Sequence, residues 1–212
     1  MGSFQSQIAN LKSKMPPVER IGLFGGSFDP VHYGHLLVAQ AACEELSLTR
    51  LFFIPAAQSP FKPDTSPAPV NQRLRLLRLA LAGQTRYEID EQEVRRGGIS
   101  YTIDTAHDYV KRFPQAQLYY LIGADHIAQL PKWRAAEELA RLVEFIVIPR
   151  PDQPAGQLKP PFRQRTLTGF PLAVSSSQVR ARIKAGLSIE LLVPAAVAEA
   201  IRDDGLYREV AI

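Results

Sequence analysis

Short apolar segments alternate with longer segments of helical periodicity along most of this chain. The apolar segments lie at 20–24, 50–56, 86–90, 117–125 and 143–150, with a short sixth at 172–174. Helical patterns lie at 33–46, 70–83, 100–113, 175–186 and 193–207, with a further helical region around Trp133. Because parallel strands need a crossover connection, usually a helix, the alternation predicts an α/β fold: a doubly wound parallel sheet with a C-terminal helical segment. In that architecture ligands bind outside the carboxyl ends of the strands, where the strand order reverses.

The length of 212 residues and the hydrophobic content of 46% suit one domain of ordinary size. We expect a single domain over 20–212, preceded by a polar, loosely ordered N-terminal extension over 1–19. The extension lacks the apolar core of a secretory signal, and no run of about 18 apolar residues exists, so we expect a cytoplasmic protein without a membrane partner. The one cysteine, Cys43, excludes an internal disulfide. Proline-rich stretches at 55–69 and 151–165 predict irregular loops.

Basic residues slightly outnumber acidic ones, with 25 Lys and Arg against 21 Asp and Glu and a net charge of +4. The arginines are spread along the chain, and no basic stripe interleaved with aromatic residues is visible. This charge favours anionic ligands, and we expect no nucleic-acid partner. The oligomeric state stays open.

The stretch GLFGGSFDPVHYGHL, residues 22–36, carries the first predicted strand into the first predicted helix. It matches neither G-x-G-x-x-G nor the P-loop. Gly25 and Gly26 can adopt positive φ and present backbone N–H groups to an anion, to which the helix N-terminus adds its positive end. His32 and His35, three residues apart, would point to one side, and Gly34 between them would leave room for a flat ligand. We interpret the stretch as a phosphate and nucleotide cradle.

Two other interpretations of this stretch are a metal site and a structural turn with incidental histidines. Zinc needs three or four protein ligands, and only His107, His126 and one cysteine remain elsewhere in the chain. We therefore expect no metal site. The pairing of the histidines with a double glycine and Asp29 disfavours the purely structural turn.

A second polar motif, VSSSQVRARIKAG at 174–186, starts another predicted helix. Serines at a helix start cap its free N–H groups, and the same groups and hydroxyls can bind phosphate oxygens. Arg180 falls within the first turns, where its guanidinium can reach a phosphate. The alternative is an ordinary serine cap beside a solvated arginine.

The first stretch resembles G-x-F-D-P-x-H-x-G-H, the signature of the nucleotidyltransferase superfamily, which is related to the HIGH motif of class I aminoacyl-tRNA synthetases. The matching residues are Gly26, Phe28, Asp29, Pro30, His32, Gly34 and His35. The second motif resembles I-S-S-T-x-I-R of that superfamily through Val174, Ser175, Ser176, Ser177, Val179 and Arg180. The resemblance implies a Rossmann-like nucleotidyltransferase fold. A synthetase is disfavoured, because no K-M-S-K-S loop is visible and 212 residues leave little room for an anticodon-binding region.

Within this superfamily the chain resembles the bacterial nicotinate-nucleotide adenylyltransferases over nearly all of residues 20–208. The segments that carry this resemblance are IPAAQSPFK (54–62), SYTIDT (100–105), LIGADHIAQLPKW (121–133), the serine motif and LVPAAVAEAIRDDGLY (192–207). The family pattern P-x-x-x-P-P-H-K is altered here, because Phe61 stands at the histidine position. Any role of that histidine is therefore not expected in this chain.

The resemblance implies three groups of site residues. The catalytic group is His32, His35 and Arg180. The ATP-binding group is Gly25, Gly26, Ser27, Phe28, Gly34, Gly123, Asp125, Ser176 and Ser177. The acceptor-binding group is Lys62, Tyr101, Thr102 and Trp133, with Trp133 stacked on a pyridine ring and Tyr101 and Thr102 in a tight turn after Gly97 and Gly98. From the residues alone, Lys62 is equally a surface lysine, Trp133 a packing residue and Asp125 a helix N-cap.

The implied reaction is attack by the 5′-phosphate of nicotinate mononucleotide on the α-phosphorus of ATP, which gives deamido-NAD and pyrophosphate in NAD biosynthesis. The second pKa of a phosphate monoester is about 6, so the nucleophile is already dianionic at pH 7 and needs no general base. Mg²⁺ is expected to arrive on the ATP phosphates, because no carboxylate cluster is evident in the sequence. The alternatives are another phosphate acceptor, such as nicotinamide mononucleotide or pantetheine phosphate, and a non-catalytic nucleotide- or nucleic-acid-binding module.

Overall fold

The computed structural model describes residues 18–60, 67–150, 156–169 and 173–208. The strands are β1 (Arg20–Gly26), β2 (Arg50–Pro55), β3 (Tyr87–Ile89), β4 (Gln117–Gly123), β5 (Glu144–Ile148) and β6 (Gln164–Thr166). The α-helices are α2 (Tyr33–Glu45), α3 (Val70–Leu81), α4 (Gln92–Arg96), α5 (Thr102–Arg112), α6 (Ala136–Leu142), α7 (Ser176–Lys184) and α8 (Ala195–Asp203). Two short 3₁₀ helices, η1 (Ala124–His126) and η2 (Leu130–Lys132), follow β4. The predicted N-terminal extension lies outside the described residues except for its last two positions.

The six strands form one sheet in the order β3-β2-β1-β4-β5-β6, and every neighbouring pair is parallel. The chain lays down β1, β2 and β3 toward one edge and then returns to the other side of β1 with β4. This is the doubly wound, Rossmann-like order, so the predicted fold class is confirmed. The strand order reverses between β1 and β4.

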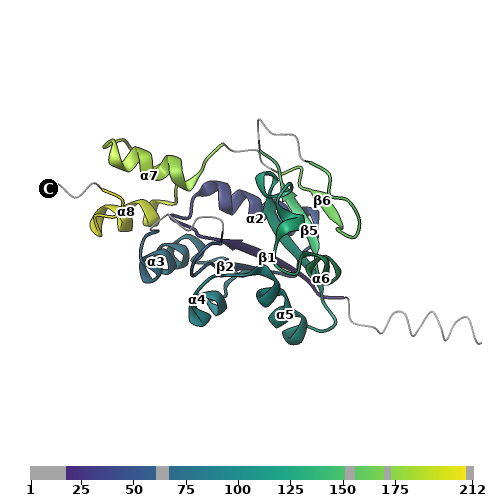
Figure 1. Ribbon diagram of the computed structural model, residues 1–212. Coiled ribbons are helices and arrows are strands. Elements are labelled where there is room, and N and C mark those ends of the chain that lie inside the picture. Colours follow the sequence, from purple (N-terminus) through teal and green to yellow (C-terminus); the bar gives the residue numbers. More distant parts are fainter. Residues whose placement is uncertain (1–17, 61–66, 151–155, 170–172, 209–212) are drawn as a thin grey trace, which may run out of the picture.

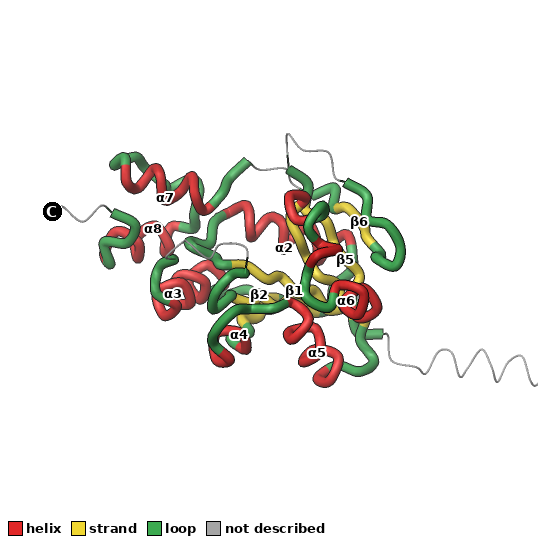
Figure 2. Tube along the Cα trace, viewed as in Figure 1, coloured by secondary structure: helices red, strands yellow, loops and turns green. Residues whose placement is uncertain are grey.

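The central strands are apolar because both faces of the sheet are covered (Figure 2). On one face, Phe24, Phe53 and Leu121 share a hydrophobic cluster with residues of α2, α3, α7 and α8. On the other face, Leu23 and Phe52 belong to a second cluster that includes residues of α5 and α6. Successive strand residues thus alternate between the two clusters, and Figure 1 shows α2 and α5 on opposite sides of the strands.

The structure differs from the sequence-based expectation at the far edge of the sheet. The last strand is β6, at 164–166, whereas residues 173 and 174 of the expected strand are not in a strand and residue 172 lies outside the described residues. The segment Gln-Arg-Thr pairs only with β5 and is largely exposed, so it carries no apolar signal. The short helix α4 was also not predicted, and the region around Trp133 consists of two 3₁₀ turns before α6. No helix within the described part of the chain is long and apolar enough to cross a membrane.

Candidate active site

A crevice opens where β1 and β4 separate at their carboxyl ends. The β1–β2 pairing continues to Gly26 and Pro55, but the β1–β4 pairing ends at Leu23 and Tyr120. The last three residues of β1 and of β4 therefore diverge, and a cavity of about 1060 Å³ lies against this opening. The place is the switch point in strand order, where ligands of doubly wound sheets bind.

Gly25 and Gly26 form the last two positions of β1, and neither has a positive φ. The positive φ that glycine permits is therefore not used at either position, and the left-handed conformation falls on Phe28, at φ 46°. Glycine is required instead by close packing. A Cβ atom on Gly25 would lie 2.5 Å from the Tyr120 hydroxyl oxygen, and one on Gly26 would lie 3.1 Å from the Phe28 ring.

We expect Gly25→Ala to lower the free energy of unfolding by about 1–3 kcal/mol, the usual cost of an overpacked site. Adding Tyr120→Phe should restore most of that loss, because the next tyrosine atom, Cζ, would lie 3.4 Å from the added methyl carbon, an ordinary contact distance. Urea unfolding of both single variants and the double variant measures the effect. Additive losses in the double variant would contradict this steric explanation.

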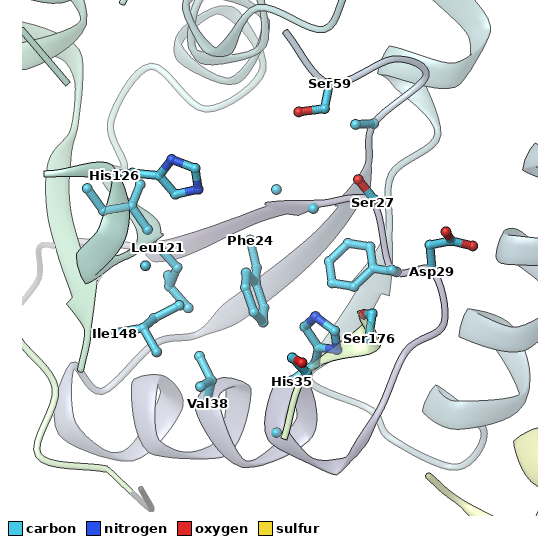
Figure 3. Close-up of a pocket in the computed structure, with 18 of the residues that line it drawn as sticks. Phe24, Ser27, Asp29, His35, Val38, Ser59, Leu121, His126, Ile148 and Ser176 are labelled. Carbon is cyan, nitrogen blue, oxygen red and sulfur yellow. The ribbon is translucent and has the colours of Figure 1, made fainter. Parts of the chain in front are cut away.

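His32 and His35 lie at the start of α2 with their ring centroids 3.8 Å apart. The backbone N–H of His32 donates to His35 Nδ1 over 3.2 Å. A neutral His35 whose Nδ1 accepts a hydrogen bond carries its own proton on Nε2, so Nε2–H is its remaining donor. Figure 3 shows the His35 ring beside Phe24 and Ser176, between the end of β1 and the start of α7.

Both imidazoles are held in the neutral form. Burial, followed by the positive charge of Arg150, lowers the pKa of His32 to about 4. Burial, followed by the charges of His32 and Arg150, keeps the pKa of His35 well below its usual 6.5. Near pH 7 the two side chains therefore act as hydrogen-bonding groups rather than cations.

These lowered pKa values predict that acid destabilises the fold. Between the unfolded pKa of about 6.5 and the folded His32 pKa of about 4, the unfolded chain binds more protons, so stability falls as pH falls through this window. The loss is up to about 1.4 kcal/mol per pH unit for each histidine. Urea unfolding of wild type and His32→Asn at pH 7.5, 6.0 and 5.0 measures it, and the control is His107→Asn, which replaces a histidine whose side chain is 40% exposed. Equal pH slopes in wild type and His32→Asn would contradict the prediction.

The space that a side chain on Gly34 would occupy is also taken by other atoms of the protein. A Cβ atom there would lie 3.0 Å from the His32 ring and 3.3 Å from the Val174 carbonyl oxygen. The missing side chain thus lets the first helix turn pack against the segment that leads into α7. Gly34 also lines the main cavity, so its predicted contact with a flat ligand stays a prediction.

The second motif meets the first at this point. Ser175 caps α7 by accepting from the Gln178 backbone N–H, and the Gln178 side chain accepts from the Ser175 backbone N–H. Ser176 Oγ donates to the Pro30 carbonyl oxygen over 2.9 Å, and Arg180 Nη1 donates to the Asp29 carbonyl oxygen over 2.6 Å. Segments about 150 residues apart in the chain are thus joined directly.

Arg73, on α3, is a buried arginine that sequence reasoning missed. Its side chain is nearly inaccessible, and it donates to the carbonyl oxygens of Ser27, Ala56 and Ala68 over 2.8, 3.0 and 3.0 Å. Burial lowers its pKa, an effect opposed by the nearby Asp29. Arg73 therefore joins the loop after β1 to two further segments, one ending before residue 61 and one beginning after residue 66.

At the end of β4, Gly123 and Asp125 lie on the opposite wall of the cavity. A Cβ atom on Gly123 would lie 2.3 Å from Asp125 Oδ1, so a side chain at this position would require the Asp125 carboxylate to move. Asp125 lies within η1, whose N-cap is Gly123, so the alternative interpretation of Asp125 as an N-cap is wrong. Its carboxylate is 3.8 Å from Arg150 Nε and 3.7 Å from His126 Nε2. Arg150, two residues after β5, was not predicted and brings a positive charge to the cavity.

A smaller pocket of about 130 Å³ adjoins the main cavity. Its lining residues are Pro60, Tyr101, Thr102, Lys132, Trp133 and Arg134, of which Pro60, Thr102 and Trp133 also line the main cavity. Trp133 meets Tyr120 edge-on, with centroids 6.4 Å apart, and the Arg134 guanidinium lies 4.7 Å from the Tyr101 ring centroid. Tyr101 is the N-cap of α5 and Thr102 its first residue, rather than members of a tight turn.

The structure brings most of the predicted site residues to one cavity. Those lining it are Gly25, Gly26, Ser27, Phe28, His32, Gly34, His35, Thr102, Gly123, Asp125, Trp133, Ser176, Ser177 and Arg180. Tyr101 lines only the smaller pocket, and Lys62 lies outside the described residues. Within the described ranges, no group of three or more His, Cys, Asp or Glu side chains could hold a metal ion.

The sequence of this chain is similar to a family model and to curated proteins over most of its length. The family model described as cytidylyltransferase-like matches residues 23–182. A protein of Opitutus terrae named "Probable nicotinate-nucleotide adenylyltransferase" is 44% identical over 89% of this chain and 98% of its own length. A protein of the same name from Geobacillus kaustophilus is 39% identical over 89% of this chain and 86% of its own length. This chain belongs to the nicotinate-nucleotide adenylyltransferase family.

The fold of this family member is shared with solved structures. The Plasmodium falciparum nicotinic acid mononucleotide adenylyltransferase complexed with NaAD superposes with a TM-score of 0.73 at 18% identity, over 89% of this chain and 97% of that one. The same enzyme complexed with APC superposes with a TM-score of 0.70, also at 18% identity and over the same shares of the two chains. The Rossmann-like nucleotidyltransferase fold predicted from the sequence is therefore confirmed.

Proposed function

We propose that this protein transfers the adenylyl group of ATP to nicotinate mononucleotide, forming deamido-NAD and pyrophosphate in the NAD biosynthesis of the cytoplasm. The observation that carries the proposal is the joining of two compartments at the β1–β4 switch point. The main cavity holds both sequence motifs, and the adjoining pocket holds Trp133 and Tyr101. Two joined compartments of this kind suit a reaction that brings two nucleotides together.

The chemistry forms a bond from a phosphate oxygen of the mononucleotide to the α-phosphorus of ATP and breaks the bond from that phosphorus to the bridging oxygen of pyrophosphate. The attacking phosphate is already ionised near pH 7, so no side chain has to remove a proton. The barrier lies in bringing two polyanions together and stabilising charge on the phosphoryl oxygens. Neutral imidazole donors on His32 and His35 and the guanidinium of Arg180 are suited to that task.

The ATP phosphates would occupy the cavity between Gly25 and Gly26 on one side and the N-terminus of α7, with Ser176 and Ser177, on the other. Asp125 would accept hydrogen bonds from ribose hydroxyls. We propose that Mg²⁺ enters with the ATP phosphates, because the described carboxylates do not form a cage for it.

The mononucleotide would place its pyridine ring in the pocket between Tyr101, Thr102 and Trp133. Lys62 stays a proposed phosphate contact from the segment outside the described residues.

Trp133→Ala should raise KM for nicotinate mononucleotide at least about fivefold, because base–aromatic stacking contributes about 1–3 kcal/mol, and should change KM for ATP much less. Steady-state pyrophosphate release with each substrate varied in turn measures both constants. Trp133→Phe is the matched control, since it keeps an aromatic face and should retain most of the affinity. An equal rise in both constants would count against stacking on the pyridine.

The function itself is tested by pyrophosphate release from Mg·ATP with a panel of acceptors. We expect turnover with nicotinate mononucleotide to exceed turnover with nicotinamide mononucleotide and pantetheine phosphate. A preference for either of the other acceptors would reassign the substrate while keeping the chemistry. ATP binding without pyrophosphate release from any acceptor would overturn the enzymatic proposal.

A further inference from the structure

Asp29 lies where four segments of the chain meet beside the cavity. Its side chain is buried, with 7% exposed, and Oδ1 accepts from the Ala68 backbone N–H over 3.1 Å and from the Tyr207 hydroxyl over 2.8 Å. Its carbonyl oxygen accepts from Arg180 Nη1, which also lies 3.6 Å from Asp29 Oδ2. In Figure 3 the carboxylate of Asp29 points away from the Phe24 ring. Asp29 thus lines the cavity and at the same time directs its carboxylate to its protein partners.

Tyr207 reaches Asp29 from the segment after α8. Gly205 and Tyr207 have φ values of 61° and 62°, and Leu206 between them is buried in the hydrophobic cluster of that face. A tyrosine in this left-handed conformation is sustained only by its surroundings. Burial, followed by the charge of Asp29, raises the pKa of Tyr207, so its hydroxyl stays protonated and is the donor in the bond to Asp29.

The two hydrogen bonds to Oδ1 fix the orientation of the Asp29 carboxylate, which leaves only Oδ2 facing Arg180 at 3.6 Å. Arginine and carboxylate groups readily form shorter bidentate pairs. Without the Tyr207 hydroxyl, the carboxylate is freer to rotate toward Arg180 and pair both of its oxygens with the guanidinium. Such a pair would turn N–H groups of Arg180 from the cavity toward Asp29.

We propose that Tyr207 is a positioning residue whose hydrogen bond to Asp29 keeps the Arg180 guanidinium available to the ligand in the cavity. The inference rests on the proposed function, in which Arg180 contacts the ATP phosphates. Tyr207 itself does not line the cavity, so its effect on the ligand passes through Asp29 and Arg180.

The test removes one oxygen atom. Tyr207→Phe should lower kcat at saturating substrates about tenfold, the rate equivalent of one hydrogen bond to a charged group, and weaken the Kd of Mg·ATP, measured by calorimetry, severalfold. Tyr87→Phe is the matched control, because Tyr87 packs against the same hydrophobic cluster from β3 and meets Phe53 instead of Asp29. Its kcat and Kd should stay within about twofold of wild type. Wild-type kcat and Kd in Tyr207→Phe would overturn the proposal.

A double-mutant cycle separates positioning from a general structural role. In an Arg180→Met background, Tyr207→Phe should change the Kd of Mg·ATP by less than about twofold, because the residue through which it acts is gone. Equal losses in the two backgrounds would overturn the route through Arg180. The Kd needs no turnover, so the cycle is informative even if the wild type releases no pyrophosphate, an outcome that would contradict only the proposed function.

Discussion

Replacing His35 with alanine is expected to lower kcat for pyrophosphate release by two or more orders of magnitude. His35 lines the cavity, its Nδ1 is occupied by the His32 backbone N–H, and its Nε2–H is the donor left for a ligand. Because the imidazole is neutral near pH 7, its contribution is a directed hydrogen bond in a buried site. Loss of one such donor to a developing charge costs about 10²–10³ in kcat. The measurement is steady-state turnover with both substrates saturating.

Two variants make the His35 result interpretable. His107→Ala removes a histidine of α5 whose ring is 40% exposed and paired with Glu138, so its kcat should match wild type. His35→Asn keeps an acceptor for the His32 N–H and an amide donor, so it should recover part of the loss. A near-normal kcat for His35→Ala with an intact fold would remove His35 from the chemistry.

The architecture was readable from the sequence because the central strands are buried on both faces. Segments such as Ile21–Phe24 and Phe52–Ile54 are apolar without interruption, and helical patterns separate them. The edge strand β6 was missed because its three residues face a single neighbour and solvent. A strand that buries so little apolar surface leaves no periodic signal.

The site could be predicted only in part, because some of its residues depend on contacts between segments that are distant in sequence. Both motifs are local in sequence, so their residues could be named, and the fold places them together. The reason for Gly25 could not be seen, since it depends on the Tyr120 hydroxyl from the neighbouring strand. Arg73 and Arg150 are single arginines among many, and their roles depend on contacts with other segments, most of them distant in sequence.

Replacing Arg73 with methionine should lower the free energy of unfolding by about 3 kcal/mol. The methionine preserves apolar bulk on α3 but removes the donors to the carbonyl oxygens of Ser27, Ala56 and Ala68. Each partly buried carbonyl that loses its partner costs about 1–3 kcal/mol, reduced here where water can reach the group. Asp29 also loses the positive charge next to it, which adds to the cost. Urea unfolding at pH 7.5 measures the change.

Arg75→Met, two residues along the same helix, is the matched control for this prediction. Arg75 is 51% exposed and pairs with Asp204 at the surface, so its loss should cost no more than about 1 kcal/mol. The two variants delete the same functional group from one helix. The deleted guanidinium is buried and donates to three carbonyl oxygens in Arg73, whereas in Arg75 it is exposed and pairs with a carboxylate. Similar small losses in both would show that the loop after β1 holds its shape without Arg73. A large loss confined to Arg73→Met would establish the buried guanidinium as the group that fixes this loop.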